Sequence, residues 1–228
     1  MTLTVTDSAG NTASRSATVR VFLNPAQDIR VNIAIERGLL YLYRDAVLYN
    51  GNNMAYFAST STNSEYRKGS NAFAVLSFEE NGHKAANDYE EDIYAELVQR
   101  GLNGLLESGK RTQHGAGNFY DHSDGTAVRD VDYLNNNGFG VVIFDSHHET
   151  YVNGIVGLAL ALATDDAVEA QNTFVNYGPL TGMSHYELMQ DLMEQFSFSL
   201  GDGAHRGAWA YSIETAQASR YDGSSQQW

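Results

Sequence analysis

Ile35–Leu40 reads IERGLL, and Val98–Asn103 reads VQRGLN. Both stretches lie in segments whose apolar residues recur every three to four positions, which is the spacing of an amphipathic helix. Each segment is followed by a loop and then by a second segment rich in small apolar residues. Repeated helix pairs are typical of stacked or closed helical arrays. The repeat therefore predicts a mainly α fold built from helix hairpins.

The same periodicity predicts five helices. They cover residues 28–43, 69–78, 89–106, 149–163 and 184–198, and the polar segments 50–63 and 108–145 are expected to be loops. Asp28 is expected to cap the first helix, and Asn81-Gly82 is expected to end the second. The fourth helix is apolar on all sides, so we expect it to be buried all round.

The first residues of the chain have a different pattern. Residues 2–22 alternate polar and apolar side chains around a cluster of turn formers, Asp7–Asn11, which is typical of a β-hairpin. A lone hairpin is marginally stable, so we expect its sheet to continue outside this sequence. Leu3–Val21 resembles the last two strands of bacterial Ig-like or PKD-type domains. Residues 1–23 are therefore expected to be the C-terminal hairpin of such a domain.

Composition excludes several kinds of protein. The chain has 228 residues, with 28 acidic against 14 basic side chains and a net charge of -14. This charge repels nucleic acids and anionic membrane surfaces, so neither is an expected partner. Cysteine is absent, which excludes disulfides, thiolate zinc sites and cysteine nucleophiles. The longest apolar run, Gly154–Ala163, is too short to cross a bilayer.

The helical part resembles the terpenoid cyclase and protein prenyltransferase family, whose helix pairs build an α/α toroid. Outer helices of that family often read as Ile35–Leu42 and Val98–Leu105 do, and inner helices read like Gly154–Ala161. Arg206–Ser212 is similar to the Gly-Gly-Trp-x-Tyr turn between its helix pairs. The resemblance covers residues 28–228 and implies the N-terminal part of an incomplete toroid, with two helix pairs and half of a third.

The catalytic signatures of that family are absent from the sequence. No D-x-D-D acid motif occurs, and the nearest strings are Asp130-Val131-Asp132 and Asp165-Asp166. No cysteine is present to complete a D-x-C…H zinc site or a C-x-E-Q thioester motif. The resemblance therefore implies a fold without a particular activity.

Polar residues at the starts of the inner helices form the candidate site. In a toroid these helix starts gather at one mouth of the barrel, where tyrosine, histidine and carboxylate side chains would suit a sugar or another polar ligand. Carboxylates there would also serve as general acid and base. The candidate ligand-binding residues are Tyr66, His147, His148, Glu149, Trp209 and Asp222. The alternative is that Asp145 or Ser146 caps the helix and that the histidines and Trp209 have only packing or loop roles.

A Gly-rich stretch offers a second kind of site. Asp121 and Asp124, with Asp130, supply hard oxygens for Ca²⁺ or another divalent metal, although their spacing matches no EF-hand. Asn135–Asn137 is expected to be a solvated turn.

Three functions stay open from the sequence. The first is an extracellular toroid module that binds a small molecule or glycan, or serves as a scaffold, beside Ig-like domains of the same parent chain. The second is an enzyme that acts on polysaccharide or a polyprenyl substrate at the barrel mouth. The third is a structural part of a bacterial surface adhesin. All three predict a location outside the cell or at its surface, with the export signal and the rest of the toroid outside this sequence.

Overall fold

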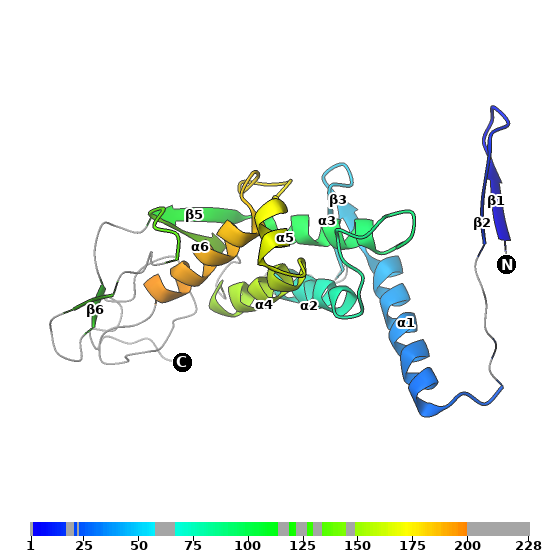
Figure 1. Ribbon diagram of the computed structural model, residues 1–228, viewed down its shortest axis with the longest axis horizontal. Coiled ribbons are helices and arrows are strands. Elements are labelled where there is room, and N and C mark those ends of the chain that lie inside the picture. The colour runs from blue at the N-terminus through cyan, green and yellow to red at the C-terminus, as the bar shows by residue number, and fades with distance from the viewer. Residues whose placement is uncertain are drawn as a thin grey trace. The chain divides into compact units, whose positions relative to one another are not determined.

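The computed structural model describes most of the chain in several segments. These are residues 2–16, 21, 23–57, 67–113, 119–121, 127–129, 134–144 and 149–199. Within them lie six helices and four two-stranded antiparallel sheets (Figure 1). The mainly helical fold predicted from the sequence is confirmed. The chain divides into two compact units, Met1–Gly38 and Leu39–Trp228.

The first unit contains the predicted hairpin. β1 (Thr2–Thr6) pairs antiparallel with β2 (Thr12–Ser16). Alternation places Leu3 and Val5 on the same side of β1, and both are exposed. The hairpin is confirmed, whereas its relation to an Ig-like domain stays a prediction.

The turn of this hairpin is built by one aspartate. The Oδ1 atom of Asp7 accepts hydrogen bonds from the backbone N–H groups of Ala9, at 2.8 Å, and Asn11, at 2.9 Å. Gly10 has a φ of +86°, a conformation that glycine adopts without a steric penalty. Asp7–Asn11 therefore forms the hairpin turn, as predicted from the sequence.

The first helix, α1, covers Gln27–Asp45. It begins before Asp28, so the prediction that Asp28 caps it is wrong. Asp28 instead lies in the first turn, where a negative charge favours the helix dipole. The border between the two units falls inside α1, after Gly38.

A short hairpin follows α1 where only a loop was expected. β3 (Val47–Tyr49) pairs antiparallel with β4 (Met54–Tyr56). The turn between them contains Asn50 and Asn52 at positive φ, which asparagine tolerates better than most residues. The Gly/Asn-rich composition thus marks a hairpin turn, and the residues of β4 are buried, with the strand in contact with α3 (Ala95–Leu106).

The second helix, α2, covers Arg67–Glu79. Its end has the hydrogen bonds of a Schellman turn: the His83 N–H donates to the Phe78 carbonyl at 3.0 Å, and the Gly82 N–H donates to the Glu79 carbonyl at 2.9 Å. Gly82 has the positive φ that this turn requires, +85°. The predicted end of the second helix at Asn81-Gly82 is therefore confirmed.

The third helix, α3, covers Ala95–Leu106 and begins later than the predicted start at residue 89. Residues 83–94 form a loop instead, because the side chain of Asp92 accepts the Tyr94 N–H at 2.9 Å and the Asn87 amide at 2.8 Å. Ile93, an apolar residue inside the predicted range of this helix, is exposed on that loop.

Strands interrupt the long segment that was expected to be a loop. β5 (Gly109–Gln113) pairs antiparallel with β8 (Phe139–Ile143), and β6 (Phe119–Asp121) pairs with β7 (Ala127–Arg129). The apolar run Val141–Ile143 is completely buried, which explains why this part of the segment is a strand.

Three helices complete the described chain: α4 (Glu149–Leu162), α5 (Ala167–Asn172) and α6 (His185–Phe198). The bounds of α4 and α6 agree with prediction to within a residue. The sequence reading missed the short α5, which Asp166 caps through its Oδ1 atom.

Hydrogen bonds fix the directions of the central helices. The Asn71 amide on α2 donates to the Gly101 carbonyl on α3 at 3.0 Å, and the Lys68 ammonium donates to the Leu105 carbonyl at 3.2 Å. The start of α2 therefore lies beside the end of α3, and the two helices are antiparallel.

The helices α2 and α4 pack side by side (Figure 1). Lys84, just after α2, forms an ion pair with Asp165, just after α4. Because the two helices end at the same side, they run parallel to each other. Their core contains large side chains that are almost completely buried: Phe78, Leu102, Leu105, Ile143, Leu160 and Leu188.

Candidate functional site

The structure describes the side chain of one predicted ligand-binding residue, Glu149. The other five, Tyr66, His147, His148, Trp209 and Asp222, lie outside the described residues. For the predicted metal site, Asp121 ends β6 without a described side chain, and Asp124 lies outside the described residues. The convergence of these residues at a barrel mouth stays a prediction.

Glu149 lies in the protein interior at the start of α4, where it is 3% exposed. One turn later, the Asn153 amide donates to the Glu149 carbonyl at 2.7 Å and to the Ile143 carbonyl at 2.8 Å. Asn153 Oδ1 accepts the Ile143 N–H at 2.6 Å. The buried Asn153 therefore joins the first turn of α4, which contains Glu149, to the end of β8.

A buried acidic pair on α6 organises the predicted solvated turn. Asp191 Oδ1 accepts the side-chain amides of Asn135, at 2.6 Å, and Asn137, at 2.8 Å. Glu194 Oε1 accepts the Leu134 N–H at 2.5 Å. Burial raises the pKa of Asp191, although the two asparagine amides oppose that shift. The turn is thus fastened to α6 instead of being merely solvated.

The hydrogen bonds accepted by the amide oxygens of Asn135 and Asn137 indicate that these residues stabilise the turn. Asn135 Oδ1 accepts the Asn137 N–H at 3.1 Å, and Asn137 Oδ1 accepts the Phe139 N–H at 2.8 Å. Because the amide oxygens bind backbone N–H groups, the amide nitrogens are left to donate to Asp191. The two amide nitrogens stabilise the Asp191 carboxylate. Neither amide oxygen is left to bind a cation.

A second buried network closes the end of α3. The Lys68 ammonium donates to the Gly104 carbonyl at 3.0 Å and lies 3.5 Å from Glu107 Oε1. The Tyr56 hydroxyl donates to the same Gly104 carbonyl at 3.0 Å and also bonds to Glu107. Burial, with Glu107 adding to it, raises the pKa of Tyr56. A cation at the last carbonyls of a helix complements the dipole, so Lys68 acts as a helix cap.

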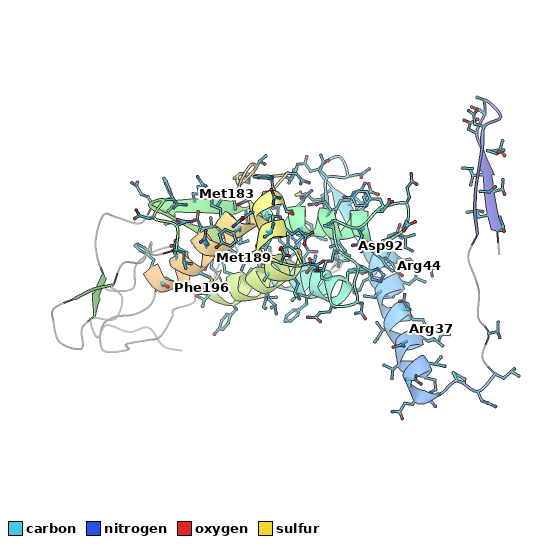
Figure 2. The ribbon with its side chains drawn as sticks, in the orientation of Figure 1. Arg37, Arg44, Asp92, Met183, Met189 and Phe196 are labelled. Carbon is cyan, nitrogen blue, oxygen red and sulfur yellow. The ribbon has the colours of Figure 1, made fainter. Side chains whose placement is uncertain are left out.

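A histidine and an aspartate pair in the loop before α3. His83 Nδ1 lies 3.1 Å from both carboxylate oxygens of Asp92, and the His83 ring packs edge-on against Tyr94 with centroids 4.6 Å apart. Asp92 is labelled in Figure 2. Burial raises the pKa of Asp92, but hydrogen bonds from Asn87, the Tyr94 N–H and His83 outweigh it and hold the pKa below its ordinary value. The pair therefore fastens the loop between α2 and α3.

One side of α4 is open to solvent, which corrects the expectation that this helix is buried all round. The exposed residues recur at helical spacing and have no charge; they are Tyr151, Gly154, Leu158 and Ala161, named here the α4 face. Tyr151 is 57% exposed and Leu158 is 55% exposed. The buried side of the helix packs on α2 and α6. The α4 face is therefore a candidate contact surface.

No family model, curated protein or solved structure matches the chain. In the segments that the structure describes, no cluster of three or more histidine, aspartate or glutamate side chains is placed to hold a metal ion. None of the described helices has the length and apolar character needed to cross a bilayer.

Proposed function

We propose that the chain is a binding or scaffold module of an α/α helical array, resembling the toroids of terpenoid cyclases and protein prenyltransferases, and that the α4 face is its contact surface. The helix directions support the array. Second helices of successive pairs, α2 and α4, run parallel and side by side, and α3 between them in sequence runs antiparallel to α2. Such alternation is what stacked helix pairs require.

The observation that carries the proposal is the composition of the α4 face. Burying Leu158 alone would contribute about 1 kcal/mol, given that about half of its surface is exposed and a whole leucine contributes about 2 kcal/mol. Gly154 leaves open space around the position of a Cβ, so another backbone or a flat ligand can approach closely. The occupant proposed for this face is therefore apolar: the next helix of the array, or an apolar ligand enclosed by it.

The other functions predicted from the sequence, an enzyme, a glycan-binding site or a structural part of an adhesin, have less support than an apolar contact surface. Among the described side chains, the buried carboxylates Asp191 and Glu194 accept hydrogen bonds from the turn they fasten, and Lys68 caps a helix. No observation on these residues favours a polysaccharide- or polyprenyl-acting enzyme or a glycan site. A place in a surface adhesin and a location outside the cell remain part of the proposal through the hairpin that resembles Ig-like domains.

The experiment is a charge placed on the α4 face. Leu158→Asp should lower the free energy of unfolding by about 1–2 kcal/mol, because the leucine is only about half buried and aspartate is the weaker helix former. It should also lower the binding of a fluorescent apolar dye, anilinonaphthalene sulfonate, measured by titration.

Val168→Asp on α5 is the matched control, because it places the same charge at another exposed apolar residue away from the α4 face. Dye binding should stay unchanged in this variant. Equal dye binding by the unmodified chain and the Leu158→Asp variant would remove the α4 face as a contact surface.

A further inference from the structure

Glu79, in the last turn of α2, is buried without a hydrogen-bond partner. It is 3% exposed, and neither carboxylate oxygen has a partner among the described residues. A buried carboxylate that lacks donors strongly favours the neutral form. Burial raises the pKa of Glu79 to about 8, with Lys84 opposing the rise and Glu80 adding to it.

The cation whose charge acts on Glu79, Lys84, already has another partner. Lys84 pairs with Asp165, and the Lys84 side chain is 19% exposed whereas that of Asp165 is 79% exposed. Ion pairs with a solvent-exposed partner contribute little to stability, typically about 0–1 kcal/mol. One ammonium group therefore serves two carboxylates: the exposed Asp165, and Glu79 whenever that side chain is charged.

Other charged groups near this end of α2 are already paired or lie elsewhere. On α3, Glu96 pairs with Arg100. In the loop before α3, His83 faces Asp92. The acidic residue of α4 is Glu149, in the first turn of that helix, whereas Glu79 lies in the last turn of the parallel α2.

We propose that Glu79 is a proton-controlled switch at the shared end of α2 and α4. While Glu79 is protonated, it lies neutral in the core and Lys84 pairs with Asp165. When Glu79 loses its proton, its carboxylate takes Lys84 as its counter-ion. The pair between Lys84 and Asp165 is then broken, and the segments that follow α2 and α4 lose this ion pair.

The sign of the pH dependence follows from the raised pKa. In the unfolded chain Glu79 titrates near its ordinary value of 4.5, and in the folded chain near 8. Its contribution to stability is present below pH 4.5 and is lost as the pH rises through 8. Between these values the unfolding equilibrium constant should rise up to about tenfold per pH unit.

The test is urea unfolding between pH 5 and 9.5 of the unmodified chain, Glu79→Gln and Glu80→Gln. Glu79→Gln keeps the shape of the side chain and removes its titration, and Glu80→Gln is the control at the exposed neighbour. We expect the loss of stability with rising pH to be reduced or absent in Glu79→Gln and retained in Glu80→Gln. An unchanged loss in Glu79→Gln would overturn the proposal.

The exchange of partners has its own measurement. A double-mutant cycle of Lys84→Met with Asp165→Asn should show coupling at pH 5.5 that disappears at pH 9.5. In a Glu79→Gln background the coupling should persist at pH 9.5. A coupling that is the same at both pH values with Glu79 in place would refute the switch.

Discussion

The helices α1 and α3 carry the same Arg-Gly-Leu triplet in different surroundings. A Cβ atom added to Gly101 on α3 would lie 2.7 Å from the Val75 side chain and 3.0 Å from the Phe57 ring. A Cβ atom added to Gly38 on α1 would meet no atom of the described chain within 4 Å. The glycine therefore allows close helix packing in α3 and has no such role in α1. A repeat in sequence need not be a repeat in packing.

Both triplets contain a buried leucine. Substitution of these leucines should change the free energy of unfolding more than substitution of the glycines or arginines. Leu102 on α3 and Leu39 on α1 are both buried in the core. Replacing either with alanine should lower the free energy of unfolding by about 2–5 kcal/mol, because the lost methyl groups leave a cavity. Urea unfolding measures the loss. A loss below about 1 kcal/mol at Leu102 would show that α3 does not anchor this core.

The surroundings of the two glycines differ. Alanine substitutions at Gly101 and Gly38 are therefore expected to change the free energy of unfolding in opposite directions. Gly101→Ala should lower the free energy of unfolding by about 1–3 kcal/mol, because the new methyl group overpacks against Val75 and Phe57. Gly38→Ala should raise it by up to about 1 kcal/mol, because alanine favours a helix over glycine. Thermal unfolding of the two variants provides the comparison. If both changes had the same sign, the contrast between α1 and α3 would be lost.

Substitution of the two arginines should change the free energy of unfolding least. Arg100 on α3 forms an ion pair with Glu96 one turn earlier, at 2.5 Å, and Arg37 on α1 is exposed. Arg100→Gln should lower the free energy of unfolding by less than about 0.5 kcal/mol, an effect that high salt should remove. Arg37→Gln is the companion variant for α1. A loss of 2 kcal/mol at Arg100 would mean that its pair with Glu96 has a structural role that exposed pairs lack.

Local patterns in the sequence predicted most of the helices. The ends of α2, α4 and α6 follow from apolar periodicity together with a glycine turn or a capping residue such as Ser184. The start of α3 was placed a turn and more too early, because Asp92 binds the backbone of the loop and competes with the helix for it. The strands of the long Gly-rich segment do not follow from its composition, because the polar and glycine residues around the apolar run of β8 are typical of a loop.

The candidate site was harder to predict than the fold. The polar networks join distant parts of the chain: Asn135 lies 56 positions from Asp191, and Tyr56 lies 51 from Glu107. No local spacing marks such pairs. The prediction that α4 is buried all round is wrong for a related reason. The composition of the helix shows that it is apolar on every side, but it does not show which sides other elements cover.

The central claim is that α4 is covered on one side and open on the other, and native-state thiol labelling tests it most directly. The chain has no cysteine, so one introduced thiol gives the only signal. Leu158→Cys on the α4 face should react with a maleimide at nearly the rate of the unfolded chain. Leu160→Cys, two residues further and buried, should be strongly protected. Equal protection of the two thiols would contradict the claim.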